Sequence, residues 1–206
     1  MVKVSELVRL FKRYYPEAHC ALDYETPEQL TVATVLSAQC TDERVNIVTR
    51  SLFKRYPDLE SLSRASLKEI EKEVHSTGFY KNKAKNLKAL SQIVVKKYSG
   101  KVPQNLEELV SLPGVGRKTA NVVLGNAFGV ASGVVVDTHV SRLSRRLGLT
   151  QQKTPEKIEE ELNRIIPKKY WIMFSHWLIW HGRGPCKARR PSCETCFLDS
   201  ICPKNL

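Results

Sequence analysis

Four of the six cysteines lie close together near the end of the sequence. These four are Cys186, Cys193, Cys196 and Cys202, whereas Cys20 and Cys40 stand alone. Clustered thiols in a reducing compartment indicate a bound metal rather than disulfides. Four thiolates could hold either a tetrahedral zinc ion or an iron–sulfur cluster, and ligand identity alone does not separate the two. We expect Cys20 and Cys40 to be buried thiols.

A second candidate for chemistry is the segment Leu-Pro-Gly-Val-Gly-Arg-Lys at residues 112–118. Pro113 disfavours helical geometry at the residue before it, so a helix that precedes this segment should end at Leu112. Gly114 and Gly116 permit unusual backbone angles and leave no side chain to block a close approach. The next helix would present unpaired N–H groups at its positive end, which binds phosphate without reading a base. The alternative is an ordinary corner between two helices.

Lys118 lies in the first turn of this second helix, where most lysines are solvated surface residues. A lysine at a helix N-terminus faces an unfavourable dipole. That field, together with burial in a pocket, would favour the neutral amine, which can act as a nucleophile. Asp137 precedes another helical run, through Val140 and Leu143, and aspartate is a favoured N-cap at such a position.

The elements that must position these residues are predicted to be helices along the whole chain. Capping-box patterns begin at Thr26 and Ser66, and Thr154 followed by Pro155 marks a further helix start. Only the three valines at 134–136 are typical of a strand, and they are too few to outweigh the helical patterns. We therefore predict an all-α fold.

Charge narrows the classes of partner. The 206 residues carry 33 Lys and Arg against 21 Asp and Glu, a formal net charge of +12, which favours an anionic partner such as nucleic acid or an anionic membrane surface.

No window of the sequence reaches the roughly 18 apolar residues of a membrane-spanning helix, and the first ten residues do not resemble a signal peptide. We expect a soluble intracellular protein. A hydrophobic content of 42% excludes a disordered chain or a fibre.

Residues 81–101 contain seven lysines and no acidic residue. Such a run is usually a solvated surface, but on a protein that binds DNA it could contact phosphates and make the affinity salt-dependent. The three histidines His139, His176 and His181 make no recognised ligand set. The segment that begins at His176 is better interpreted as an aromatic core helix.

Several of these segments together resemble the endonuclease III family of helix-hairpin-helix DNA glycosylases. The resemblance rests on residues 112–118, on Val-Asp-Thr-His-Val at 136–140, on Leu-Ser-Ala-Gln-Cys-Thr-Asp at 36–42 and on Thr-Gly-Phe-Tyr-Lys-Asn-Lys-Ala at 77–84. The spacing of the four clustered cysteines is also similar to that of the family. The resemblance covers nearly the whole chain.

This resemblance implies a bifunctional DNA glycosylase and abasic-site lyase of base excision repair that removes oxidised pyrimidines. Lys118 would attack the sugar C1′ and form a Schiff base, after which the 3′ phosphate leaves by β-elimination. Asp137 would help activate Lys118 and stabilise positive charge at the sugar. The alternatives are a glycosylase for mismatched or oxidised purines and a non-catalytic DNA-binding module.

The resemblance also assigns contacts with DNA. Gly114, Gly116 and Arg117 would bind the backbone, and Gln39 and Phe79 would fill the space left by an extruded nucleotide. Many relatives carry leucine where Phe79 stands. Considered without the family, Gln39 is interpreted as a polar residue at a helix end and Phe79 as a core aromatic.

The implied fold has two helical lobes with the active site at their junction. One lobe is a helical barrel of residues 23–131 that includes the hairpin at about 106–125, and the other combines residues 1–22 with 132–206. Cys186, Cys193, Cys196 and Cys202 would hold a structural [4Fe-4S] cluster in the loop 186–202, with a zinc protein as the alternative. The implied partner is damaged double-stranded DNA, bound by a monomer in the cytoplasm, associated with the nucleoid and not with a membrane.

Overall fold

The computed structural model describes residues 2–205. Met1 and Leu206, which belong to the expected second lobe, lie outside the described residues. Helices form all of the regular structure in this range, without a strand, so the predicted all-α fold is confirmed. The chain divides into two compact units, one of residues Ala21–Val130 and the other of Met1–Cys20 with Ala131–Leu206.

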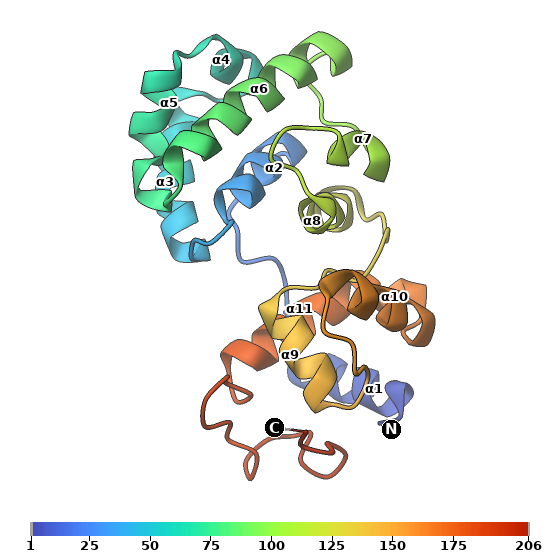
Figure 1. Ribbon diagram of the computed structural model, residues 1–206. Coiled ribbons are helices and arrows are strands. Elements are labelled where there is room, and N and C mark those ends of the chain that lie inside the picture. Colours follow the sequence, from blue (N-terminus) through green and yellow to red (C-terminus); the bar gives the residue numbers. More distant parts are fainter. Residues whose placement is uncertain (1, 206) are drawn as a thin grey trace. The chain divides into compact units, whose positions relative to one another are not determined.

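The unit Ala21–Val130 is built around a buried helix, α2 (Figure 1). Its elements are α2 (Pro27–Leu36), α3 (Asp42–Arg55), α4 (Leu59–Arg64), α5 (Leu67–Val74), η1 (His75–Thr77), α6 (Tyr80–Tyr98), α7 (Leu106–Val110) and α8 (Arg117–Phe128). Helix α2 is buried from Leu30 to Leu36 and packs against α3, α6 and α8, as expected for a helix inside a core.

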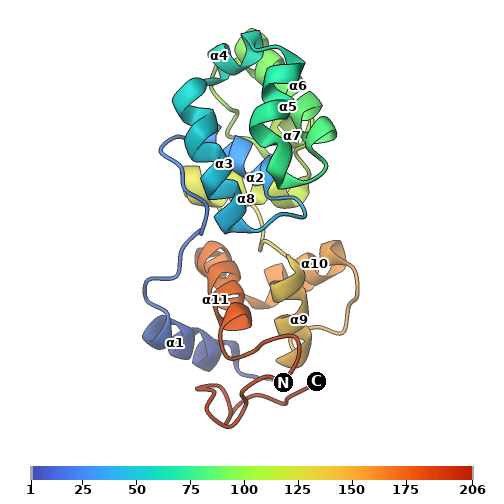
Figure 2. The same ribbon diagram turned by 90° about the vertical axis from the view of Figure 1, so that its left-hand side faces the viewer.

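The second unit has an aromatic core. Its elements are α1 (Val4–Tyr14), α9 (Thr138–Arg146), α10 (Pro155–Ile165), η2 (Lys168–Tyr170) and α11 (Trp171–Arg183), seen from another side in Figure 2. Phe11 stacks on Trp177 with ring centroids 5.9 Å apart and meets Phe174 edge-on. His176 and His181 are buried in α11, which confirms the predicted aromatic core helix.

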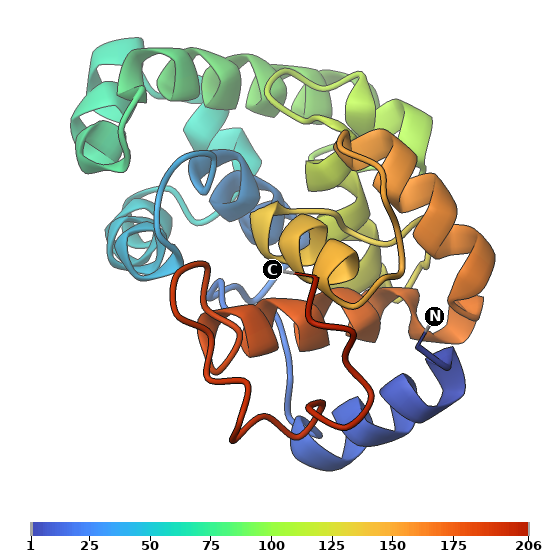
Figure 3. The same cartoon turned by 60° about the horizontal axis from the view of Figure 1, so that its bottom comes forward.

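Residues 184–205 have no regular structure and fold back over their own unit. Figure 3 shows this segment leaving the end of α11 and passing α1. There Phe197 stacks on Tyr14 at 4.2 Å, and farther on the N–H of Asn205 donates to the carbonyl of Arg146 at the end of α9. These contacts attach the cysteine-rich segment to α1 and α9.

The predicted helix starts are correct, but their caps differ. Ser66 forms the full capping box with Glu69, whereas the side chain of Gln29 accepts from the N–H of Glu25 rather than from Thr26. Thr154 provides no side-chain cap for α10. Helix α7 ends at Val110, two residues before the predicted end, because residues 111 and 112 form a turn.

The valines at 134–136 form an extended connection rather than a strand. The N–H of Val134 donates to Asn163 Oδ1 at 3.0 Å, and that of Val135 donates to Ser175 Oγ at 2.9 Å. Side chains thus take the place of a neighbouring strand. Cys20 and Cys40 are both partly exposed, so the expectation that they are buried thiols is wrong.

Candidate active site and cysteine cluster

The turn between α7 and α8 contains two glycines that differ in their backbone geometry. Gly114 has a φ of +78°, and a Cβ placed there would lie 3.0 Å from Cβ of Asn86. Gly116 has a φ of −85°, which other residues also adopt, so only Gly114 uses the backbone freedom that glycine permits. A Cβ on Gly116 would meet no atom within 4 Å, which leaves open space beside the start of α8.

Helix α8 begins at Arg117 with Gly116 as its N-cap, a residue that has no side chain with which to cap the helix. The first N–H groups of a helix have no intrahelical partner, and they carry the positive end of the helix dipole. A helix start with a glycine N-cap beside open space is the arrangement that the sequence predicted for a phosphate site. Arg117 and Lys118 are both exposed in the first turn.

The exposure of Lys118 corrects one expectation. The side chain was expected to be buried in a pocket, but it lies at the solvent-facing start of α8.

Asp137 caps α9, as predicted. Its Oδ1 accepts a hydrogen bond from the N–H of Val140 at 2.8 Å. Helix α9 is in turn attached to the C-terminal segment by two arginines. Arg142 donates to the carbonyls of Gly182 and Cys186, and Arg146 donates to those of Lys187 and Ala188. The sequence reasoning missed both arginines.

Gln39 and Phe79 lie on two short connections of the unit Ala21–Val130. Gln39 is exposed between α2 and α3 with a φ of +53°, and Phe79 is exposed before α6 with a φ of +48°. Phe79 is 66% exposed, which excludes a core aromatic. Both residues adopt a backbone conformation that is uncommon for residues other than glycine.

Two lysines of the run 81–101 do not belong to a solvated surface. Lys83 is buried, and the ammonium of Lys88 donates to the carbonyl of Ala65. The expected phosphate-contacting surface is therefore smaller than the run, and Lys81 and Lys85 are exposed members of it.

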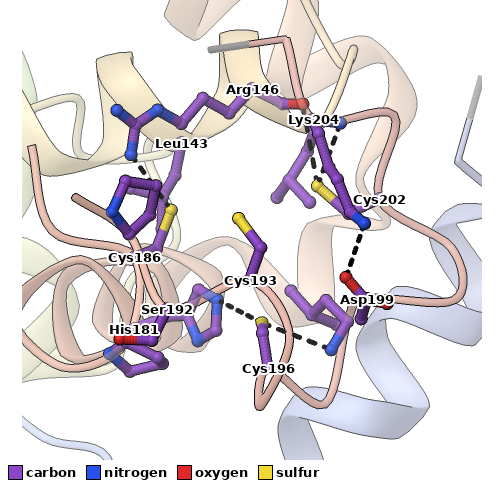
Figure 4. A pocket seen from close by; sticks show the side chains of 14 residues that line it. Leu143, Arg146, His181, Cys186, Ser192, Cys193, Cys196, Asp199, Cys202 and Lys204 are labelled. Atoms are coloured by element: carbon purple, nitrogen blue, oxygen red, sulfur yellow. Dashed lines mark hydrogen bonds and ion pairs between the residues drawn. The ribbon is translucent and has the colours of Figure 1, made fainter.

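The four clustered cysteines line one pocket in the unit that contains α9 and α11. Figure 4 shows Cys186, Cys193, Cys196 and Cys202 around this space, and Leu143 lines it from α9. Three of the sulfur atoms have N–H groups directed at them. The partners are Arg146 Nη1 for Cys186, the N–H of Leu198 for Cys196 and the N–H of Lys204 for Cys202, each at 3.4 Å. Such N–H groups stabilise thiolates.

His181 adds a further polar group at this pocket. Burial lowers the pKa of His181 to about 4, so the ring is neutral near pH 7. Burial, together with Cys196 and Cys186, raises the pKa of Tyr15 to about 12, so its hydroxyl remains protonated. Nδ1 lies 3.0 Å from Tyr15 Oη, and Nε2 lies 3.4 Å from Cys196 Sγ. A neutral imidazole carries one N–H, so one of these two ring nitrogens donates and the other accepts.

We also examined whether the possible metal-ligating side chains lie close enough together to hold a single metal ion. Within residues 2–205, no three His, Cys, Asp or Glu side chains come together closely enough to hold one metal ion. Four thiols distributed around a pocket can hold a group of several metal atoms.

Across residues 2–205, no helix combines the length and the apolar character needed to cross a membrane.

Comparisons with known proteins agree with these features. Residues 32–168 match the family described as HhH-GPD superfamily base excision DNA repair protein. Endonuclease III of Synechocystis sp. is 54% identical over 201 residues, which cover 98% of this chain and 92% of the relative. Endonuclease III of Bacillus subtilis is 47% identical, with coverages of 91% and 86%.

Solved structures show the same similarity. A trapped covalent intermediate of an endonuclease III with DNA matches with a TM-score of 0.92 and 42% identity, covering 99% of this chain and 97% of that one. A thymine-DNA glycosylase, at 23% identity, shares the fold with a TM-score of 0.88. The chain therefore belongs to the endonuclease III family, within the HhH-GPD superfamily of base excision DNA repair proteins.

Proposed function

We propose that this protein is a DNA glycosylase and abasic-site lyase of base excision repair, acting on oxidised pyrimidines in double-stranded DNA through Lys118. The observation that supports this most directly is the exposed amine of Lys118 in the first turn of α8, next to a helix start with a glycine N-cap and the open space at Gly116. A phosphate bound at that start would lie beside the nucleophile.

In the proposed reaction, Nζ of Lys118 forms a bond to the sugar C1′ while the glycosidic bond breaks and the base leaves. Opening of the sugar ring gives a Schiff base, which acidifies the C2′ proton. Loss of that proton expels the 3′ phosphate and cleaves the strand. Water then releases the lysine. A nucleophilic amine that divides a difficult step into easier ones is common in covalent catalysis.

We assign the proton of the Lys118 ammonium to Asp137. Its Oδ1 accepts from the N–H of Val140, so Oδ2 is the oxygen that would take this proton and later face the positive charge at the sugar. Lys118 belongs to the unit Ala21–Val130, and Asp137 belongs to the other unit.

The four thiols Cys186, Cys193, Cys196 and Cys202 would hold a [4Fe-4S] cluster. The shared pocket and the N–H groups directed at three sulfurs support this proposal. The cluster would supply structural cross-links to the irregular segment. It would thereby fix Lys187, Arg189 and Arg190, which are exposed and cationic, for contact with phosphate.

The proposed partner is damaged double-stranded DNA, bound by a monomer at the nucleoid in the cytoplasm. Gln39, Phe79, Gly114, Gly116 and Arg117 would contact it. The net charge of +12 supports a polyanionic partner.

A panel of duplexes tests the substrate class. Each duplex carries one oxidised pyrimidine, one oxidised purine or one mismatch, and base release and strand cleavage are measured separately. We expect release and cleavage with oxidised pyrimidines. Activity only on purines would show that the alternative glycosylase is correct, and binding without any release would indicate a non-catalytic module.

Metal analysis tests the cluster. We expect iron and sulfide in equal amounts, a brown colour, and loss of both after Cys196→Ala. Stoichiometric zinc in the protein as isolated would contradict the cluster.

A further inference from the structure

Lys83 is a buried lysine in a part of α6 where the sequence suggests a solvated surface. Only 5% of the residue is exposed. Its Nζ donates to the carbonyl of Leu36 at 2.8 Å and to that of Thr77 at 2.7 Å. A buried ammonium is tolerated when it is hydrogen-bonded. Burial lowers the pKa of Lys83, and Cys40 opposes this shift.

The two carbonyls belong to the segments that carry Gln39 and Phe79. Leu36 is the last residue of α2, so its carbonyl is at the negative end of that helix, and Gln39 follows shortly after. Thr77 is the last residue of η1, and Phe79 follows after Gly78. One nitrogen therefore connects two segments that are far apart in the sequence.

Both segments contain a strained backbone that needs support. Gln39 and Phe79 have φ values of +53° and +48°. Non-glycine residues hold such conformations where the surrounding structure fixes them. The N–H of Lys83 also donates to the carbonyl of Phe79 at 3.1 Å, so the backbone and the side chain of one residue both hold the Phe79 segment.

We propose that Lys83 is a positioning residue that keeps the Gln39 and Phe79 segments in fixed register, so that both side chains enter the duplex together when a damaged nucleotide is extruded. This inference rests on the proposed function. Extrusion costs the free energy of unstacking and unpairing a base. Side chains held in place beforehand can fill the gap without first being ordered, whereas loosely held ones cannot.

The test compares two substrates in the same duplex sequence. One carries a base-paired oxidised pyrimidine, and the other carries a preformed abasic site, which has no base to unpair. For each variant, the rate of borohydride-trapped complex on the paired lesion is divided by the rate on the abasic site. Both rates scale with the amount of folded enzyme, so partial unfolding does not change this quotient.

Lys83→Met removes the ammonium and keeps an unbranched apolar side chain that is one atom shorter. We expect it to lower the quotient about tenfold, because small misplacements in a reacting complex reduce rates by such factors. Lys88→Met is the matched control, since Lys88 lies on the same helix and also donates to a backbone carbonyl, that of Ala65. The control should leave the quotient unchanged, and Lys83→Arg, which retains donors for both carbonyls, should recover most of it.

Phe79→Ala should also lower the quotient, and adding Lys83→Met to it should cause little further loss, because both act through the same inserted side chain. Equal losses of Lys83→Met on the two substrates, or losses that multiply with Phe79→Ala, would overturn the proposal. If Lys83→Met does not fold, Lys83→Gln, with one amide donor group, provides the same comparison. Absence of trapping by the wild type on both substrates would instead contradict the proposed function.

Discussion

Asp137 combines a structural role with a proposed catalytic one, and the two can be separated by substitution. As N-cap of α9 it accepts from Val140 through one oxygen. Asparagine is an equally good N-cap but cannot take a proton from an ammonium. The structural role therefore depends on an acceptor, and the catalytic role depends on a carboxylate.

We predict that Asp137→Asn keeps the thermal stability of the wild type but lowers strand cleavage by about 10²-fold or more. Asp137→Ala should lose the same activity and about 1 kcal/mol of stability in addition. Thermal unfolding and single-turnover cleavage, measured on both variants, check this. An active Asp137→Asn variant would assign Asp137 to the cap alone.

At the level of single residues, the sequence located the capping aspartate and the clustered cysteines but not Lys83. A lysine in a lysine-rich run is interpreted as surface. A signal was present, however, because Lys83 precedes Leu87 by one helical turn and lies on the same face as Leu90 and Val94, which are buried. Without the resemblance, Phe79 would be misinterpreted in the opposite direction, as a core residue, since aromatic character alone does not distinguish a buried side chain from one exposed by its backbone conformation.

Among the elements, the hairpin between α7 and α8 shows how two glycines can serve different purposes. Gly114 is required by its positive φ and by the close approach of Asn86, both of which are properties of the fold. Neither reason applies to Gly116. The lack of a side chain at Gly116 therefore matters only for a molecule, such as DNA, that approaches the hairpin from outside.

We predict that Gly114→Ala destabilises the protein by about 1–2 kcal/mol, the cost of a left-handed conformation for an L-residue. Gly116→Ala should leave stability within about 0.5 kcal/mol of the wild type. It should weaken binding of duplex DNA about tenfold, as expected for one lost hydrogen bond to a charged group. Unfolding curves and equilibrium binding by fluorescence anisotropy give both quantities. Unchanged DNA affinity of Gly116→Ala would remove the hairpin from the DNA contacts.

Helix starts were predicted well because capping residues act locally. The caps themselves were predicted less well, since the N–H of Glu25 competes for Gln29. The extended valines at 134–136 obtain their partners from Asn163 and Ser175, and such distant contacts have no local sequence signal.

For the molecule as a whole, the net charge of +12 predicts that the affinity for DNA depends strongly on salt concentration. If about six phosphates are contacted, DNA affinity should fall by about 10³-fold between about 50 and about 200 mM salt, because bound counterions are released on association. Lys81→Ala should reduce the slope of log affinity against log salt by about 0.9. Anisotropy titrations at several salt concentrations measure this slope, and a salt-independent affinity would contradict a phosphate-based interface.

The central claim is that Lys118 forms a covalent bond with the sugar of a damaged nucleotide. Borohydride reduction of a mixture of the enzyme and a duplex with one oxidised pyrimidine tests this directly, with Lys118→Ala beside the wild type. We predict a stable protein–DNA adduct with the wild type, attached at Lys118, and none with the variant. A wild-type protein that binds this duplex but yields no adduct, or an adduct that persists in Lys118→Ala, would contradict the claim.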